Sequence, residues 1–140
     1  MKVIFLDIDG VLAPLTLRGL SSHALDLFAS IVKKTDADVV LSSQWRLPNC
    51  RDQRMRLQQE LGKREVGLFS TTPVLNTTRG DEITCWLRDR EHKHFIKFVI
   101  LDDDPNDEMG ELKPHLVKCD GYQGLTQDIA DEVVRRLNQL

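Results

Sequence analysis

Two aspartates separated by one residue, Asp7 and Asp9, are the first residues of this sequence whose spacing suggests chemistry. Carboxylates this close repel each other unless a proton or a cation lies between them. They follow the apolar run 3–6, which is typical of a parallel strand buried on both faces. Open α/β sheets bind their ligands at the carboxyl ends of such strands. The pair therefore indicates a metal site at a strand end, where Gly10 allows the chain to turn away.

A second acidic cluster follows the predicted buried strand 97–101, where Asp102 and Asp103 mark another strand end. Between residues 101 and 111 there are six acids and no basic residue. That density at a strand end is difficult to explain without a bound cation, because unpaired carboxylates are costly to gather. The neighbouring Asp104 and Asp107 fit a role near the metal and simple turn chemistry equally well.

A phosphoryl group can be attacked by a carboxylate only if positive charge offsets their repulsion. Mg²⁺ suits carboxylates and phosphate oxygens together, and a hydroxyl at a strand end can hold the phosphate. The predicted strand 39–41 ends in Ser42 and Ser43. We favour Ser42 because it comes first after the strand, although a shift of one residue would put Ser43 in its place.

A basic side chain at the same edge of the sheet would complete such a site, and Arg79, Lys93 and Lys97 are the candidates. Lys97 begins the strand that ends at Asp102, which places it about 16 Å away at the opposite edge. Lys93 lies in the loop that leads into that same wrong edge. Arg79 begins a predicted helix on the correct side, so it is the favoured cation.

Strands that alternate with helices predict an α/β fold over residues 1–140 as a single domain. We expect a three-layer, doubly wound and mostly parallel sheet. Only residues 13–20 separate the first acidic pair from the next helix, which is too short for a cap domain. The other predicted elements are a helix capped by Ser21 or Ser22, a helix 51–61 stopped by Gly62, a strand near 66–69, a helix capped by Thr77 or Thr78, a strand 116–119 and a helix capped by Thr126.

The net charge and the cysteine content limit which binding partners and which cellular compartment the sequence suggests. The net charge of −3 argues against a protein that coats nucleic acid by bulk electrostatics. Residues 44–64 nevertheless carry six basic and two acidic residues, so this segment could contact a nucleic acid or nucleotide through Arg46, Arg51 and Arg54. The three cysteines match no zinc spacing and suit a reducing cytoplasm. No apolar stretch approaches the ~20 residues of a membrane span, and no obligate protein partner is evident.

Taken in order, these residues resemble the four short motifs of the haloacid dehalogenase (HAD) superfamily of phosphatases: Asp7-Ile8-Asp9-Gly10, Ser42, Arg79 and Asp102-Asp103. The run Ser-Ser-x-Trp-Arg at 42–46 is similar to that of small capless HAD domains, including those of RNA-repair proteins. The superfamily more often has Lys in the third motif, so Arg79 is a departure.

The resemblance implies a role for each residue. Asp7 would be the nucleophile that forms an aspartyl-phosphate, and Asp9 would be the general acid and base. Mg²⁺ would be bound by Asp7, by the main-chain carbonyl of Asp9, by Asp102 and by Asp103 as a further candidate. Ser42, or Ser43 in its place, and Arg79 would hold the phosphate.

The sequence therefore predicts a Mg²⁺-dependent phosphomonoesterase acting on an accessible phosphate of a bulky substrate, such as a nucleic-acid end or a nucleotide. A phosphoprotein or small-metabolite phosphatase is the alternative within the same chemistry. A non-catalytic phosphate- or metal-binding module is the alternative outside it, although both aspartates of the first pair are intact. A response-regulator receiver fits poorly, because the second acidic cluster comes too late in the chain.

Overall fold

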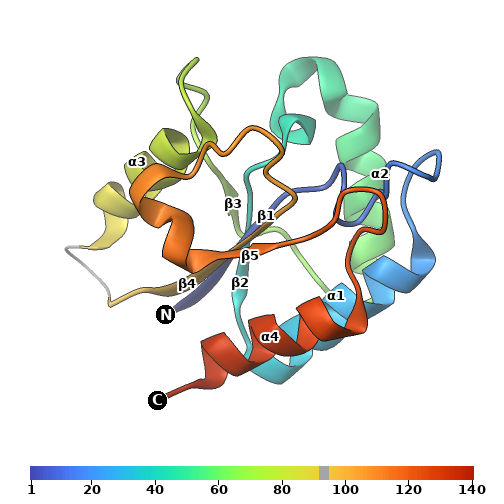
Figure 1. Cartoon of the computed structure of the whole chain (residues 1–140). Coiled ribbons are helices and arrows are strands. Elements are labelled where there is room, and N and C mark those ends of the chain that lie inside the picture. The colour runs from blue at the N-terminus through green and yellow to red at the C-terminus, as the bar shows by residue number, and fades with distance from the viewer. Residues whose placement is uncertain (92–94) are drawn as a thin grey trace.

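One parallel sheet runs through the computed structural model, which describes residues 1–91 and 95–140 (Figure 1). Its strands, as far as these residues extend, lie in the order β3-β2-β1-β4-β5. All four pairings are parallel, which confirms the predicted α/β class. The bounds are β1 (Lys2–Leu6), β2 (Asp38–Leu41), β3 (Ser70–Thr71), β4 (Lys97–Asp102) and β5 (Leu116–Lys118).

Helices cover both faces of the sheet and complete the predicted three layers (Figure 1). One face is covered by α1 (Ser22–Thr35), α2 (Arg51–Gly62) and α4 (Gln127–Asn138). The other face is covered by α3 (Arg79–Glu91) and the 3₁₀ helix η3 (Gly110–His115). Two more 3₁₀ turns, η1 (Gln44–Arg46) and η2 (Pro48–Cys50), lead from β2 into α2. No cap domain is inserted within the described residues.

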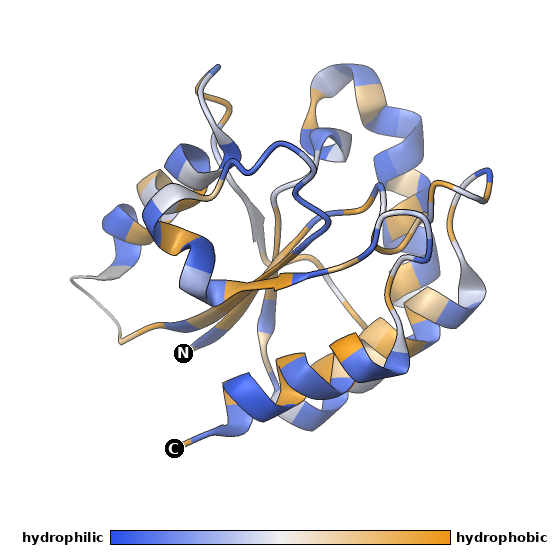
Figure 2. Ribbon diagram, viewed as in Figure 1, coloured by the Kyte–Doolittle hydropathy of each residue, from blue (hydrophilic) through white to orange (hydrophobic). Residues whose placement is uncertain are grey.

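The central strand β1 is buried on both faces, as its apolar run predicts. Val3 and Phe5 pack against α3, whereas Ile4 and Leu6 belong to the core beneath α1 and α4. The Phe5 ring meets Trp86 of α3 edge to face, with 5.3 Å between the ring centroids. Figure 2 shows the same division, with apolar residues along the strands and on the sheet-facing sides of α1 and α4.

Two predicted boundaries were wrong. The segment 66–69 is not a strand: Val66 is buried in the core with α2, and its N–H bonds the Leu61 carbonyl as the helix ends. The chain reaches β2 only at Phe69, so β3 forms at Ser70–Thr71. Gly62 does not stop α2 either; the helix includes it, and the left-handed residue that follows is Glu65, at φ 63°.

The order of the connections explains where a site can form. The helices after β1 and β2 lie on one face, while those after β3 and β4 lie on the other. The winding therefore reverses between β1 and β4, and the loops that leave their carboxyl ends diverge to open a crevice. Asp7 and Asp102 lie at this point.

Across residues 1–91 and 95–140, no helix combines the length and apolar character that crossing a membrane requires. The three cysteines are free thiols, and Cys119 is buried.

Candidate active site

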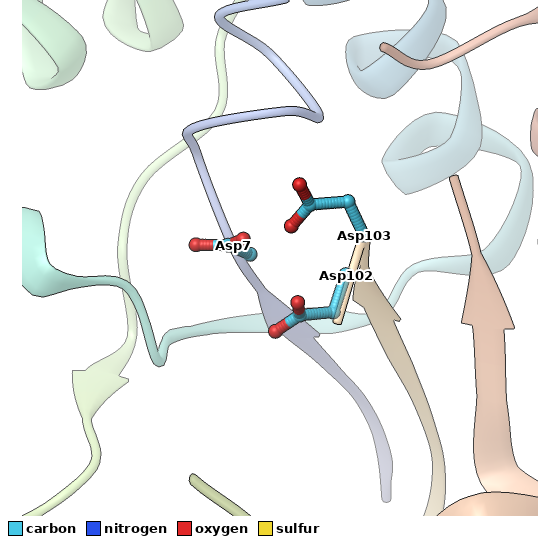
Figure 3. A group of neighbouring side chains, drawn as sticks. All are labelled: Asp7, Asp102 and Asp103. Carbon is cyan, nitrogen blue, oxygen red and sulfur yellow. The ribbon is translucent and has the colours of Figure 1, made fainter. Parts of the chain in front are cut away.

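Three carboxylates meet at the carboxyl ends of β1 and β4. Asp7, Asp102 and Asp103 each place one oxygen within 4.8 Å of the others. Figure 3 shows their side chains around a common space beyond the two strand ends. The register explains the meeting: Leu6 pairs with Leu101, so Asp7 and Asp102 are the next residues on two adjacent strands. The structure thus brings together the two acidic clusters that are about a hundred residues apart in sequence.

Arg79, the first residue of α3, contacts two of the three carboxylates. Its Nη1 lies 2.8 Å from Asp102 Oδ2 and 3.3 Å from Asp7 Oδ1. Arg79 thus lies at the predicted end of the strands, whereas Lys97 pairs with Lys2 at the opposite end of β4. The third candidate, Lys93, lies outside the described residues.

The protein alone does not neutralise these carboxylates. Burial and the charge of Asp102 together raise the pKa of Asp7 to about 8, because Arg79 only partly opposes them. Burial also raises the pKa of Asp102. One guanidinium faces three acids, so the cluster has an affinity for additional positive charge, from protons or from a cation. Hard carboxylate oxygens at this spacing fit a Mg²⁺ ion, with Asp7, Asp102 and Asp103 as its side-chain ligands.

Asp103 is held in place by two close backbone approaches. Gly10 has a φ of 82°, and a Cβ built on it would overlap the Asp103 carboxylate. A Cβ on Gly121 would come within 2.6 Å of Asp103 Oδ2. Gly10 therefore does more than turn the chain, because its missing side chain leaves room for a candidate metal ligand.

Asp9 lies outside the carboxylate cluster and is exposed to solvent. Its Oδ2 accepts a hydrogen bond of 3.2 Å from the indole Nε1 of Trp45. Trp45 is at the same time 9% exposed and part of the core. Trp45 therefore packs in the core and also contacts a candidate catalytic residue. The indole thus fixes the orientation of Asp9 while leaving this side chain open to proton exchange.

The two serines after β2 differ in what their hydroxyls do. Ser43 Oγ accepts from the Trp45 N–H at 3.1 Å and caps η1. Ser42 Oγ is fully buried and has no hydrogen-bond partner in the part of the chain that is described. Because the ladder bond from Ser42 N to Leu6 O places Ser42 beside Asp7, its hydroxyl is the one available for a ligand.

Sequence reasoning missed Thr72, a second buried hydroxyl without a partner among the described residues. The register aligns Leu41 with Thr71, so Thr72 follows Ser42 in the same row across the strand ends. This row faces α3, since the preceding residues on that side are the core residues Phe5, Val40 and Ile100. The signal for Thr72 was absent from the sequence, because a two-residue strand leaves no hydrophobic pattern to predict.

A pocket of about 270 Å³ opens over the carboxylates, at the divergent ends of β1 and β4. Leu15, from the segment after the first aspartates, forms part of its wall, and the Leu15 N–H bonds the Gly121 carbonyl. Gln44, Arg79 and Glu108 form the opposite side. A larger hollow of about 580 Å³ lies between α3 and η3 and contains none of the three carboxylates.

The remaining acids of the second cluster serve the turn. Asp104 Oδ1 accepts from the Glu108 N–H at 2.9 Å, and its own N–H bonds Asp102 Oδ1 at 2.7 Å. Asp107 pairs with Lys113 at 3.2 Å on the surface. The Asp104 side chain thus makes a turn contact beside the pocket, whereas Asp107 contacts a lysine on the surface.

The arginines of the basic segment occupy different environments. Arg46 is buried and donates to main-chain carbonyls, and Arg54 donates to the carbonyls of Trp45 and Leu47. Arg51, the first residue of α2, is exposed.

Comparison with known proteins agrees with this geometry. A family model described as the HAD domain in Swiss Army Knife RNA repair proteins matches residues 3–130. The chain belongs to this HAD family. Searches of curated proteins and of solved structures found no match. Membership makes the chain a HAD-type hydrolase or phosphatase at the level of the superfamily, and its acidic cluster is one that could hold a metal.

The raised pKa of Asp7 predicts how the metal-free HAD domain responds to pH. Its carboxyl binds a proton up to about pH 8 when folded but only to about pH 4 when unfolded, so stability falls as the pH rises between these values. We expect Asp7→Asn to weaken this dependence, so that the variant's gain in stability over wild type is larger at pH 8 than at pH 5 by more than about 1 kcal/mol. Urea unfolding in a chelator measures the difference. Equal pH profiles for the two proteins would contradict it.

Removing the space above Asp103 should damage the metal site. Gly10→Ala places a methyl group against the Asp103 carboxylate, so we expect Mg²⁺ affinity, measured by calorimetry, to fall by roughly tenfold or more. Gly19→Ala is the matched control, because Gly19 has a φ of 101° with open space around it. The control should lose about 1 kcal/mol of stability from the strained backbone and keep its Mg²⁺ affinity. Equal losses of affinity would rule out the steric explanation.

Proposed function

We propose that this HAD domain is a Mg²⁺-dependent phosphomonoesterase that acts through an aspartyl-phosphate on Asp7. The observation that carries the proposal is the position of the Asp7 carboxylate, in reach of Arg79 on one side and beside the unpartnered Ser42 hydroxyl on the other. A nucleophile placed between the Arg79 guanidinium and a free hydroxyl donor suits an anionic, multi-oxygen substrate.

Mg²⁺ would be held by the side chains of Asp7, Asp102 and Asp103 and by the main-chain carbonyl of Asp9. When bound, it supplies the positive charge that lets a carboxylate approach a phosphate. Arg79 contributes further charge from the start of α3, and its contact with Asp102 holds it there. The raised pKa of Asp7 supports this assignment, because a nearby cation is what would keep that carboxylate ionised at neutral pH.

In the first half of the reaction, an Asp7 oxygen forms a bond to phosphorus while the bond from phosphorus to the leaving oxygen breaks. Asp9 gives its proton to that leaving oxygen. The Ser42 hydroxyl and the Arg79 guanidinium donate to the phosphoryl oxygens as their charge increases. The hydrogen bond from Trp45 to Asp9 keeps the acid pointed along one direction.

In the second half, a water oxygen attacks the same phosphorus and the bond to Asp7 breaks. The ionised Asp9 takes the proton of that water, which returns both aspartates to their starting states. Solvent exposure of Asp9 supports its use in both directions, since its proton can exchange between the two steps.

A bulky substrate that presents its phosphate at a chain end, such as a nucleic-acid end, fits best. No cap covers the pocket in the described residues, and the family is the HAD domain of RNA repair proteins. The exposed Arg51 could contact the polymer backbone, whereas Arg46 and Arg54 already donate to the protein. We further propose that the protein works in the cytoplasm, which would keep its three thiols reduced.

The proposal predicts Mg²⁺-dependent release of phosphate that requires Asp7. Assays should compare 3′- and 5′-phosphorylated oligonucleotides, nucleotides, phosphopeptides and a small phosphate ester, with Mg²⁺ and with a chelator. Asp7→Asn should lower kcat/KM by roughly a thousandfold or more, because the attacking oxygen is lost. Asp107→Asn, an exposed acid of the neighbouring loop, should leave it unchanged. Full activity in Asp7→Asn would overturn the mechanism, and preference for the small ester would overturn the substrate class.

The salt dependence of turnover should reveal a polymer contact at Arg51. Phosphate contacts release counterions, so kcat/KM for an oligonucleotide should fall steeply with salt, and Arg51→Ala should reduce the slope by about 1 on a log–log plot. The same variant should leave the rate on a nucleotide unchanged. Lys33→Ala, exposed in the last turn of α1 at the opposite edge of the sheet, is the control and should keep the full slope. A slope that Arg51→Ala does not alter would exclude this contact.

A further inference from the structure

Arg46 is the most completely bonded side chain near the site, although nothing about its chemistry requires it to be buried. The side chain is 5% exposed. Four hydrogen bonds and one ion pair occupy the three nitrogens of its guanidinium. The hydrogen bonds run to the carbonyls of Thr72 at 3.0 Å, Ser42 at 3.2 Å, Ser43 at 2.9 Å and Pro73 at 3.2 Å, and the ion pair joins Nη2 to Glu82 Oε1 at 2.8 Å.

These acceptors come from three separate elements. Two of the carbonyls follow β2, two follow β3, and Glu82 belongs to the first turn of α3. Glu82 Oε2 also accepts from the Leu75 N–H at 3.0 Å, in the loop between β3 and α3. The Arg46–Glu82 ion pair therefore connects the end of the hydroxyl row to the helix whose first residue is Arg79.

Stability alone is a weak explanation for this ion pair. Burying two charges costs desolvation energy that their attraction often fails to recover, so a buried pair is better understood as fixing an arrangement. The arrangement in question is the backbone of Ser42 and Thr72. Their buried hydroxyls have no partner within residues 1–91 and 95–140, so other groups must hold these residues in position. The bonds from Arg46 to their carbonyls do so and leave the hydroxyls free for a ligand.

We infer that Arg46 is a positioning residue for phosphate binding, which aligns the Ser42 hydroxyl and the start of α3 through main-chain carbonyls and Glu82. This inference rests on the proposed function, since it concerns the phosphate side of that site. Arg46 makes no contact with the carboxylate cluster, because Asp7 and Asp102 leave β1 and β4 on the other side of Ser42. It should therefore affect phosphate binding separately from Mg²⁺ binding.

The test measures two affinities on each variant by calorimetry: Mg²⁺ alone, and inorganic phosphate in saturating Mg²⁺. Arg46→Lys keeps the charge but not the five-fold donor geometry, so phosphate affinity and kcat/KM should each fall tenfold or more while Mg²⁺ affinity stays within about twofold. Glu82→Gln should shift the same two quantities in the same direction by a smaller factor. It serves as the second variant if Arg46→Lys folds poorly.

Arg90→Ala is the matched control, because Arg90 stacks on Trp86 of α3 at 4.0 Å and its loss should lower the melting temperature without touching the site. It should leave both affinities unchanged. If Arg46→Lys retains wild-type phosphate affinity, or loses Mg²⁺ and phosphate affinity together, the positioning role is wrong while the proposed function stands. Wild-type protein that neither binds nor releases phosphate would overturn the proposed function and this inference with it.

Discussion

The structure depends on the placement of like charges at buried strand ends. Adjacent parallel strands lie about 4.8 Å apart, so the register that pairs Leu6 with Leu101 forces Asp7 and Asp102 together. Both are nearly inaccessible, and Asp103 adds a third carboxylate. Arg79 offsets part of this charge, and burial raises the pKa of Asp7 and Asp102. Such a cluster costs the metal-free fold stability, and that cost is the physical source of its affinity for a cation.

Strand order divides the site into two halves around the central β1. On the β4 side lie the carboxylates that could hold a metal, and on the β2 and β3 side lie two buried hydroxyls, Ser42 and Thr72. Asp7 stands at the boundary, and Arg79 reaches it from α3 above the sheet. A phosphate placed over Asp7 would thus lie between Arg79 with the candidate metal ligands and the two hydroxyls. The arrangement follows from five parallel strands in one order and needs no inserted domain.

The sequence predicted the site residues that directly follow a buried, apolar strand. Asp7, Ser42 and Asp102 each follow such a run, and the distance along β4 was enough to prefer Arg79 over Lys97. The strand after α2 was misplaced because a short polar strand has no alternating hydrophobic pattern that could identify it. β3 is Ser70–Thr71, whereas the apolar Val66 that suggested a strand packs beneath α2. Because β3 was predicted in the wrong place, the sequence did not show that Thr72 lies beside Ser42. It also did not show which main-chain carbonyls Arg46 would bond.

The five residues after β2 show why a segment's net charge says little about its function. A 3₁₀ turn rotates successive side chains by about 120°, so neighbours in sequence reach different places. Ser42 keeps a free hydroxyl, Ser43 caps the turn, and Gln44 lines the pocket. Trp45 orients Asp9, the proposed acid and base, and Arg46 bonds the carbonyls that follow two strands. Arg46, which the sequence assigned to a basic surface, thus has a buried side chain that connects these strand ends. The segment 42–46 therefore joins the proposed phosphate hydroxyl, the bond that orients Asp9 and the ion pair to α3, so a change in this segment should affect all three.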